Sequence, residues 1–575
     1  MAGPTTTTTT TKHHQRGSGG SGGANRRGGN GGNNNNNADD AAANPVELTL
    51  RKHMDAETGA ARDVRGMGIN GTVRLVSSSS EENDDKEGGG GDGKKRKTTP
   101  VPFELPKGLG TNSVKNVPVT LLDEAERKIR RPKVDADDIY RLLVEHYDLG
   151  EIRRDSMREL ASYDDKNWYF KARTTDPKTG KPVETEYVVK VHNGMDSSGV
   201  SRGVLAAQER VMMFLQDQGI VCSQVVRSKL AMYTTPGPNG TVQLVPAGTK
   251  GAKLEYCMRV TFLARNQIAH TMRVLTFVRG KLLVQVPMPH PEEFVYRSGV
   301  FVGRICDALS KWPTPHQLEL QKARAGDVDA ASASYIEQHA LCWQVLASRS
   351  RLWDLRFFMD VQHFMTDLIM RGLFTDDTRI MMCNTVFNAF KHLVQPVSEK
   401  LRVGVLHNDL NEQNIIALES VDPVVSPQDA EFGVIDFGDV VVSWRVNEIA
   451  IAMAYCCLEK QLPVRDMSVM LAGIQSVYPL TPLEMRILPC LICARLVTSL
   501  VMGMYSYHMQ IIGDGEDAQG GGANAPTGND YVLTTQKTGW YALTRLLTVG
   551  AEVIFKRFIA DSYAENYSTL PGRDM

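Results

Sequence analysis

The spacing of hydrophobic and polar positions divides the chain into a polar beginning, a strand-rich middle and a helical end. In residues 134–149, VDADDIYRLLVEHYDL, apolar side chains recur at helical spacing behind a cluster of acids, which predicts a helix. Short β-branched and aromatic runs separated by turn residues then predict four strands, NWYFKART, TEYVVKVHN, KLEYCMRVTFL and MRVLTFVRG. A helix at 204–219 with Gly219 as its stop falls between the second and third runs, so we expect a helix packed on a small antiparallel sheet.

From about residue 290 onward the hydrophobic period is mostly that of helices. Two strand-like pieces, NIIALES and EFGVIDFGDVVV, interrupt this pattern within 402–441, and helices resume at Arg445. The longest apolar run, 487–505, predicts a buried helix and not a membrane span. It is interrupted by Pro489, Arg495, Thr498 and Ser499. The pattern as a whole predicts an α+β chain with a small antiparallel sheet followed by a larger, mainly helical part.

The first hundred residues are dominated by Thr, Gly, Asn and Ser. Such sequence lacks the apolar side chains that would offset the entropy of ordering, so we expect a disordered low-complexity tail over 1–115. The sheet and its helix would then occupy 116–280, and the helical part 281–575. Within the latter, GDGEDAQGGGANAPTGND at 513–530 is typical of a mobile loop.

Charge and cysteine content exclude several classes of protein. With 65 Lys+Arg against 66 Asp+Glu, no global field recruits nucleic acid or an anionic membrane, so ligand charge must be met locally. The nine cysteines are scattered in apolar stretches, which indicates a reducing compartment. We therefore expect a cytoplasmic protein, and keep a mitochondrial one as the alternative because 1–38 is basic and free of acids. Cys490 and Cys493 form a CxxC without a second ligand pair, so we interpret them as core residues.

One short stretch carries the strongest chemical signal: VLHNDLNEQNII, residues 405–416. It forms an HxDxxxxN pattern and is followed by DFG, which begins at Asp436. Phosphoryl transfer needs a carboxylate for the acceptor hydroxyl and oxygen ligands for the Mg²⁺ that bridges the donor phosphates. The pattern predicts Asp409 as the base and Asn414 and Asp436 as metal ligands. Each motif alone is equally typical of an Asx-rich turn or a capped strand end, but their order indicates a kinase.

Residues upstream fit the donor side of such a reaction. Lys190 in EYVVKVHN lies on a predicted strand, like the lysine that holds the α and β phosphates in kinases. Its acidic partner should come from the next helix, where Glu209 is the nearest acid and Gln208 stands beside it.

Two further segments are candidates for contacts with a nucleotide. No glycine-rich GxGxxG is present, and ELASYDDKNWYF takes its place between the first strands. Its candidate phosphate contacts are Ser162, Asp165 and Asn167, although the same residues also suit an ordinary hairpin turn. Backbone groups near Leu275 and Phe277, in the segment RVLTFVRGK, are the candidates for pairing with a purine edge.

These segments together resemble the aminoglycoside phosphotransferase and choline kinase group, and within it the hydroxylysine kinases. The resemblance extends from about 135 to 570 and includes LASYDDKNWYF, EYVVKVHN, LHNDLNEQNI, GVIDFGDVVVSWRVNEIAIAMAY, LVTSLVMGMYSYHM and YVLTTQKTGW. It implies a two-lobed protein-kinase-like fold that transfers phosphate from GTP to 5-hydroxy-L-lysine, with Mg²⁺ as cofactor. The group usually has glycine where this chain has Asn408.

An acceptor with two ammonium groups and one carboxylate requires acids near the catalytic loop. Glu412, Asp439 and Glu448 are the candidates, and Arg445 is the candidate for the carboxylate. Glu448 also suits a plain stabilising charge at a helix start. Choline, ethanolamine, homoserine, methylthioribose or aminoglycoside kinases remain alternatives within the same chemistry, and a non-catalytic kinase-like binding module is the alternative of another class.

Overall fold

The computed structural model describes the chain at 72–74, 121–175, 179–197, 202–229, 232–236, 242–245, 253–256, 259–323, 330–349, 351–456, 458–514 and 535–562. All of these residues belong to one compact unit, Glu57–Met575. The predicted tail and the predicted mobile loop lie outside the described residues, with two exceptions. Strand β1 (Thr72–Arg74) pairs in parallel with β10 (Val260–Leu263), which corrects the expectation of a structureless tail at that point, and helix α12 (Pro482–Asp514) runs into the start of the expected loop.

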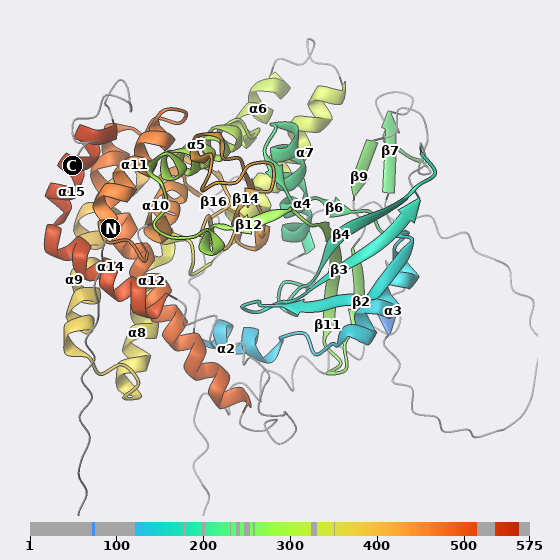
Figure 1. The fold of residues 1–575 in the computed structure, drawn as a ribbon, viewed down its shortest axis with the longest axis horizontal. Coiled ribbons are helices and arrows are strands. Elements are labelled where there is room, and N and C mark those ends of the chain that lie inside the picture. Colours follow the sequence, from blue (N-terminus) through green and yellow to red (C-terminus); the bar gives the residue numbers. More distant parts are fainter. Residues whose placement is uncertain are drawn as a thin grey trace, which may run out of the picture. The chain divides into compact units, whose positions relative to one another are not determined.

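The first part of the unit is a mostly antiparallel sheet in the order β1-β10-β11-β4-β3-β2, with β6 also paired to β11 (Figure 1). Helix α3 (Ala136–His146) covers this sheet and begins at Asp135, whose side chain accepts hydrogen bonds from two backbone N–H groups. Alternate side chains of β3, such as Trp168 and Phe170, join the helix in a core of their own. The bounds of the other strands are β2 Glu151–Leu160, β3 Lys166–Thr175, β4 Pro182–Val191, β6 Val225–Val226 and β11 Ala269–Thr276.

A predicted strand divides in two in the structure. KLEYCMRVTFL forms β9 (Lys253–Tyr256), which pairs with β7 (Met232–Pro236), and β10, which pairs with β11. β7 also pairs with β8 (Val242–Val245), so β7, β8 and β9 form a small separate sheet. The apolar run therefore serves two sheets, which its period alone does not show.

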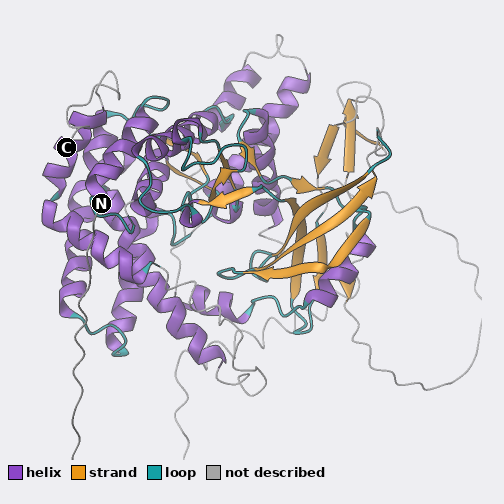
Figure 2. Ribbon diagram, in the orientation of Figure 1, coloured by secondary structure: helices purple, strands orange, loops and turns teal. Residues whose placement is uncertain are grey.

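The second, larger core is built from helices, and α4 (Arg202–Asp217) joins this core through Val211, Met212 and Leu215. Gly219 follows α4 with a φ of 75°, as its predicted role as a stop requires. Figure 2 shows most of the helices gathered apart from the main sheet, with α3 lying against it. Their bounds are α2 Leu121–Ile129, α5 Glu292–Ser310, α6 Pro315–Ala323, α7 Ala330–Ala347, α8 Val361–Met370, α9 Asp377–Leu393, α10 Arg445–Cys456, α11 Pro463–Gln475, α14 Gln536–Val549 and α15 Ala551–Ser562.

Short strands inside the helical part support the loops of interest. β13 (Val403–Leu406) pairs with β16 (Val441–Trp444), and β14 (Ile415–Leu418) pairs with β15 (Phe432–Val434). β14 also pairs with β12 (Gly280–Leu282), and β15 with β5 (Val221–Cys222), which directly follows α4 and Gly219. The 3-10 helices are η3 Leu283–Gln285, η4 Leu355–Asp360, η5 Gln395–Lys400, η6 Pro427–Asp429 and η7 Phe437–Asp439. These pairings confirm an α+β, two-lobed arrangement, in which backbone bonds tie the two lobes together.

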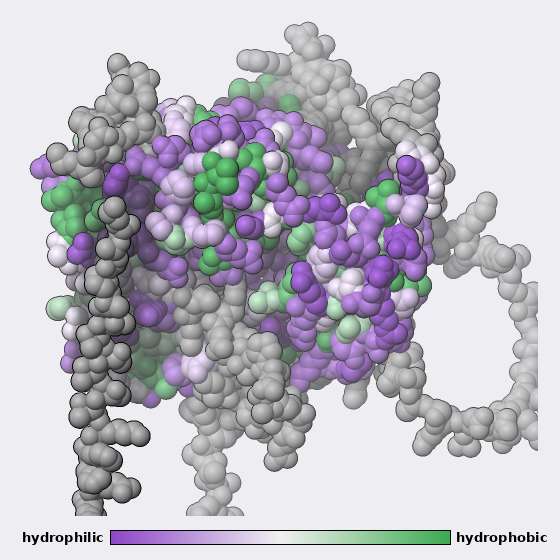
Figure 3. Space-filling model, in the orientation of Figure 1, coloured by the Kyte–Doolittle hydropathy of each residue, from purple (hydrophilic) through white to green (hydrophobic). Residues whose placement is uncertain are grey.

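Helix α12 is long and apolar enough to cross a membrane, with a mean hydropathy of 2.0, but 94% of that window is buried inside the protein. It is therefore the core helix that the sequence predicted, and Cys490 and Cys493 are buried, free thiols within it. On the face drawn in Figure 3, hydrophilic side chains predominate among the described residues. That distribution is expected when the apolar side chains gather in two cores.

Candidate active site

The loop between β13 and β14 is held in shape by its own residues. The N–H groups of Asn414 and Ile415 both donate to the carbonyl of Asn411, at 3.1 and 3.2 Å. The side-chain amides of Asn411 and Asn414 donate to Oδ2 of Asp409, at 3.0 and 2.7 Å. Burial raises the pKa of Asp409 to about 7, and the charge of Arg495 opposes the rise. The predicted base thus combines a fixed carboxylate with a pKa suited to proton transfer near neutrality.

His407 anchors this loop and does not face an acceptor. The ring is fully buried, with Nε2 3.0 Å from the carbonyl of Ile435 and Nδ1 3.3 Å from the backbone nitrogen of Asp409. Burial lowers the pKa of His407 to about 4, so the ring is neutral at pH 7. With Nε2–H donating and Nδ1 accepting, one neutral imidazole joins the two motifs that the sequence singled out.

Asn408 takes the left-handed backbone conformation, with a φ of 67°. Glycine adopts this conformation without strain and asparagine tolerates it better than most residues, which explains a glycine at this position in the resembling group. The side chain is buried, and neither of its polar atoms has a hydrogen-bond partner in the described structure.

Glu448 was wrongly predicted as an acceptor contact. Its carboxylate is fully buried and accepts the backbone N–H groups of His407 and Asn408, at 2.6 and 3.0 Å. Burial raises the pKa of Glu448 to about 8, and the two N–H donors oppose the rise. Glu448 lies in the first turn of α10, and from there its carboxylate holds the backbone at the start of the loop.

Arg445, expected to meet the acceptor carboxylate, also lies elsewhere. Its guanidinium donates to the carbonyls of Val403 and Ser310, at 3.1 and 3.3 Å, and thereby joins β13 to α5. The prediction failed because Arg445 is the first residue of α10, and its contacts with β13 and α5 keep it out of the lining of the pocket described below.

Asp436 lies directly after β15 in a turn, and not on a strand as the sequence indicated. The residue has a φ of 57° and caps η7, with Oδ1 accepting the N–H of Gly438 at 3.0 Å. The same oxygen lies 2.6 Å from Nζ of Lys190, so the lysine of β4 reaches the DFG turn directly. The left-handed turn is what separates β15 from β16 and points the carboxylate toward the lysine.

The acidic partner of Lys190 was wrongly predicted as Glu209. Oδ2 of Asp165 lies 3.3 Å from Nζ of Lys190, whereas Oε2 of Glu209 accepts from Arg259 at 2.9 Å. Burial alone would lower the pKa of Lys190, but the charges of Asp436 and Asp165 hold it above its usual value.

The polar residue of α4 that lines the pocket described below is Gln208. Its amide donates to the carbonyl of Gly438 at 3.0 Å, and its oxygen accepts from Arg273 at 2.8 Å. Neighbouring helical positions point about 100° apart, so a register error of one residue exchanges a site residue for one on another face.

The segment that replaces a glycine loop contributes part of its predicted set. Ser162 and Asp165 line the pocket described below. Asn167 lies outside that lining, on β3 and in register with Lys190, and its side-chain oxygen is buried without a hydrogen-bond partner in the described structure. Asp165 also accepts the N–H of Asn193 at 2.8 Å, so its charge is used within the protein. Its observed role is to hold Lys190, and a direct phosphate contact by this carboxylate would be repulsive.

Leu275 and Phe277 do not offer the free backbone edge that was predicted for a purine. Leu275 is buried in β11 and pairs with both β4 and β6. The N–H of Phe277 donates to the carbonyl of Glu186 at 3.1 Å, and that of Thr276 to Gln224 at 2.8 Å. Strand β11 ends at Thr276, earlier than the predicted run MRVLTFVRG, but the N–H groups of Thr276 and Phe277 are still used in bonds to neighbouring segments.

A pocket of about 490 Å³ opens between the loop of Asp409 and the sheet, within the size range of small-molecule sites. Two of the predicted acceptor acids, Glu412 and Asp439, line it. Burial raises the pKa of Glu412 to about 7, and its buried Oε2 has no hydrogen-bond partner among the described residues. Aromatic and cationic residues complete its wall: Tyr163, Trp353, Tyr455, Arg127, Arg351 and Arg495.

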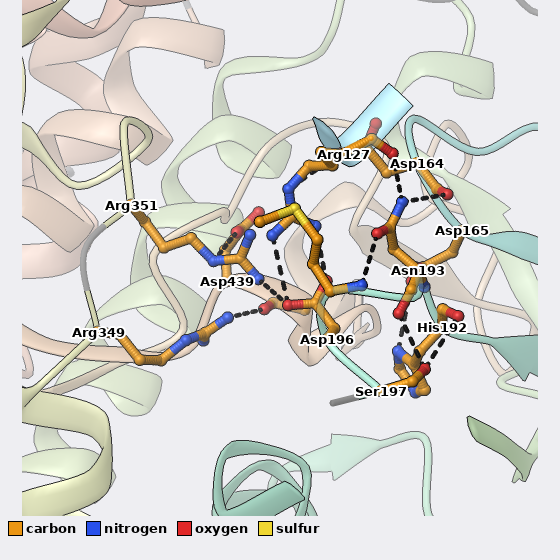
Figure 4. A network of polar contacts seen from close by, with 12 residues as sticks. Arg127, Asp164, Asp165, His192, Asn193, Asp196, Ser197, Arg349, Arg351 and Asp439 are labelled. Atoms are coloured by element: carbon orange, nitrogen blue, oxygen red, sulfur yellow. Dashed lines mark hydrogen bonds and ion pairs between the residues drawn. The ribbon is translucent and has the colours of Figure 1, made fainter. Parts of the chain in front are cut away.

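The cations of this wall were missed from the sequence. Figure 4 shows Arg127 of α2 and Arg351 converging on Asp196, at 2.6 and 2.9 Å. Nε of Arg351 lies 4.0 Å from Asp439, and Arg349 donates to the carbonyl of Gly438 at 3.0 Å. No local motif predicts these contacts, because the partners are far apart in sequence.

Arg495 had a signal that could have identified it. It is the single cation in the apolar run 487–505, and a buried charge in such a helix needs a partner. The partner is Oδ1 of Asp409, 2.7 Å from Nη2 of Arg495. In the sequence, Arg495 was interpreted only as an interruption that makes a membrane span improbable.

The donor set fits a hard divalent cation. Asn414 uses its amide nitrogen to bond Asp409, which leaves its side-chain oxygen to act as a ligand. Asp436 engages Lys190 and Gly438 through Oδ1, which leaves Oδ2. The two residues are neighbours through the bond from the N–H of Ile435 to the carbonyl of Asn414, at 2.9 Å. Asn414 and Asp436 are therefore suited to hold Mg²⁺.

Comparison with known proteins agrees with this geometry. A family model described as the phosphotransferase enzyme family matches residues 158–478. Hydroxylysine kinase of Mus musculus is 25% identical over 398 residues, which are 69% of this chain and 86% of the relative. Hydroxylysine kinase of Xenopus laevis is 24% identical over 440 residues, which are 76% of this chain and 96% of the relative.

Solved structures of small-molecule kinases are also similar, at low identity. The amicoumacin kinase hAmiN, in complex with AMP-PNP, Ca²⁺ and Ami, is 13% identical with a TM-score of 0.41, over 75% of this chain and 96% of that one. A microcompartment-associated aminopropanol kinase is 13% identical with a TM-score of 0.41, over 71% of this chain and 97% of that one.

The family match covers more than half of the chain, and it contains Lys190, Asp409, Asn414 and Asp436. A nucleoside triphosphate as donor and a small molecule as acceptor follow from this membership and from the relatives. The chain belongs to the phosphotransferase enzyme family, as a small-molecule kinase that acts on a hydroxyl group.

Proposed function

We propose that the protein transfers the γ-phosphate of GTP to the hydroxyl group of 5-hydroxy-L-lysine, giving 5-phosphohydroxy-L-lysine, with Mg²⁺ as cofactor. The observation that carries the proposal is Oε2 of Glu412, which is buried in the wall of the pocket that contains Asp409 and has no hydrogen-bond partner among the described residues. A buried carboxylate oxygen without a donor is a site for an ammonium group. The names of the relatives, which match over most of their length, support hydroxylysine as the acceptor and leave the donor base to experiment.

The charges of the pocket fit this acceptor. Hydroxylysine carries two ammonium groups and one carboxylate at neutral pH. We assign Glu412 and Asp439 to the ammonium groups, since both line the pocket beside Asp409. Arg351, which lies 4.0 Å from Asp439, replaces Arg445 as the cation near the acceptor.

In the proposed reaction the acceptor oxygen attacks the γ-phosphorus while the bond from that phosphorus to the β–γ bridging oxygen breaks. Asp409 accepts the proton of the hydroxyl group. Lys190, held by Asp165 and Asp436, contacts the donor phosphates. Asn414 and Asp436 would hold Mg²⁺, which supplies positive charge to the phosphate oxygens. Catalysis by such a site is mainly positioning, which agrees with the number of hydrogen bonds that fix Asp409.

The test is a turnover assay of the purified full chain with Mg²⁺, GTP or ATP, and a panel of acceptors. The panel contains 5-hydroxylysine, choline, ethanolamine, homoserine and an aminoglycoside, with product mass as the readout. L-lysine is the matched control, because it has the same charges and no hydroxyl group, so it should inhibit without being phosphorylated. Turnover of choline without turnover of hydroxylysine would reject the proposed acceptor, and a preference for ATP would reject the proposed donor.

Variants test the acceptor assignment separately from the chemistry. E412Q removes the charge that awaits an ammonium group, so we expect the KM for hydroxylysine to rise about tenfold while the KM for the nucleotide stays within about twofold. Glu419, which is exposed and lies outside the pocket lining, provides the control E419Q. Equal effects of E412Q on both KM values would contradict a role at the acceptor.

A further inference from the structure

Arg495 lies at the centre of α12, outside the residues that the family model matches. Its side chain is 1% exposed, and Nη2 lies 2.7 Å from Oδ1 of Asp409. Nη1 donates to the carbonyl of Trp353 at 2.7 Å, and the guanidinium lies over the rings of Trp353 and Tyr455, 5.0 and 5.4 Å from their centroids. One hydrogen bond and two aromatic rings therefore fix the position of the guanidinium independently of its contact with the Asp409 carboxylate.

The donors to Asp409 divide into two kinds. Asn411 and Asn414, which bond Oδ2, belong to the same loop and move with it. Arg495 bonds the other oxygen, Oδ1, and comes from a helix 86 residues away in sequence. Among the side-chain hydrogen bonds of the described residues, it is the contact that fixes the Asp409 carboxylate relative to a different element. Asn411 and Asn414 fix the rotation of the Asp409 carboxylate, and Arg495 fixes its position in the pocket.

The face of α12 that carries Arg495 also forms part of the pocket wall. Ser499 and Gly503, four and eight residues further along, line the same pocket. Positions at this spacing lie on one face of a helix. Arg495 is thus the charged member of a stripe that faces the site, which argues against an arginine that merely fills a place in the core.

We propose that Arg495 is a positioning residue for phosphoryl transfer, whose guanidinium holds Oδ1 of Asp409 at the point where the acceptor hydroxyl must arrive. The proposal rests on the role proposed above for Asp409. It places a determinant of catalysis outside the family-matched segment, on the helix that also forms the wall of the acceptor pocket. Arg495 touches neither the nucleotide nor the phosphate in this scheme, so its loss should leave donor binding intact.

The first test compares R495M and R495K with R486M, a matched change at an exposed position of the same helix. We expect R495M to lower kcat about 100-fold, the size of effect that a misplacement of about 1 Å produces. The KM for the nucleotide and the affinity for a fluorescent nucleotide analogue should stay within about twofold. R495K keeps the charge but loses the paired donors, so its kcat should lie between that of R495M and that of the unchanged protein. A kcat for R495M within about threefold of the unchanged protein would overturn the proposal.

The second test separates positioning from a purely structural role. Methylguanidinium added to R495A should restore part of kcat, because it can occupy the space between Trp353, Tyr455 and Asp409. The double variant D409N/R495M should be no slower than D409N alone, since an arginine that acts through Asp409 has nothing left to position. Absence of rescue together with additive losses would overturn the proposal. If R495M does not fold, R495K with unchanged nucleotide affinity gives the decisive kcat.

Both tests use whichever acceptor the panel identifies, so failure of hydroxylysine as the acceptor does not affect them. Full activity of D409N would reject the proposed role of Asp409 itself. Loss in D409N with no loss in R495M and R495K would reject only the role of Arg495. The two proposals therefore fail in distinguishable ways.

Discussion

The pocket has two kinds of wall, and they differ in how the sequence encodes them. In the loop of Asp409, polar groups bond to partners a few residues away, such as Asn411 and Asn414 to Asp409. Outside it, α2 and α12 send Arg127 and Arg495 to partners 69 and 86 residues distant. The catalytic loop can therefore be recognised from a short sequence motif, whereas the position of its carboxylate in the pocket depends on helices that carry no motif.

The largest expected effect comes from the local region. D409N removes the proposed proton acceptor but keeps the shape of the side chain, so we expect kcat to fall about 1,000-fold, within the range for general base catalysis. Nucleotide affinity should change little. A turnover assay measures kcat, and binding of a fluorescent nucleotide analogue by the same preparation measures nucleotide affinity. A rate close to that of the unchanged protein would show that the local loop does not carry the chemistry.

The next effect concerns the placement wall. R127M removes the cation of α2 that holds Asp196, and leaves that half-buried carboxylate to Arg351 and to the charge of Arg349. We expect the free energy of unfolding to fall by about 2 kcal/mol, less than when one partner of a fully buried ion pair is removed, and kcat/KM to fall about tenfold. Chemical denaturation and steady-state kinetics measure the two.

The matched control for this helix is R130M, since Arg130 pairs with Glu126 on α2 itself. Its effect should be below about 1 kcal/mol, the usual size for an i, i+4 pair. Equal effects of R127M and R130M would mean that the link from α2 to Asp196 adds nothing to the site.

Removal of residues 1–110 takes away the short edge strand β1 but should preserve activity, because the described residues that line the pocket begin at Asp123. Turnover by the shortened protein measures this.

Much of the catalytic set could be predicted because its residues lie in two short motifs. The positions of Asp409, Asn414 and Asp436 followed from the spacing of these motifs, and the hydrophobic pattern gave β3, β4 and β11, but β2, β7 and β8 were not predicted. The errors arose where a residue's direction depends on the fold, as with Gln208 in place of Glu209 and with the buried Glu448. A spacing rule gives neighbours along the chain, but the face that each presents is fixed by packing.

A pH experiment tests the local network through His407. Burial lowers the pKa of His407 from 6.5 to about 4, so between these values the unfolded chain binds a proton that the folded protein excludes. Stability is therefore fully present above pH 6.5 and falls as the pH drops toward 4. The shift corresponds to at most about 3 kcal/mol.

H407Q is the variant for this measurement, because an amide can still donate to the carbonyl of Ile435 and does not titrate. Its free energy of unfolding should fall less than that of the unchanged protein between pH 6.5 and 4. Burial also lowers the pKa values of His192 and His290 to about 4, but both are present in the two proteins, so the difference isolates His407. Identical pH profiles would show that His407 is not the neutral anchor that joins the two motifs.

The smallest expected effect is that of N408G. The φ of 67° at Asn408 suits glycine, and the substitution removes a buried amide without partners in the described structure. Against this gain, glycine loosens the unfolded chain, so the free energy of unfolding should change by less than about 1 kcal/mol and kcat by less than about threefold. N408A is the control, since alanine pays about 1–2 kcal/mol in this conformation. If N408G were folded but inactive, the amide of Asn408 would act in the chemistry, and the local loop would hold one polar group more than its hydrogen bonds reveal.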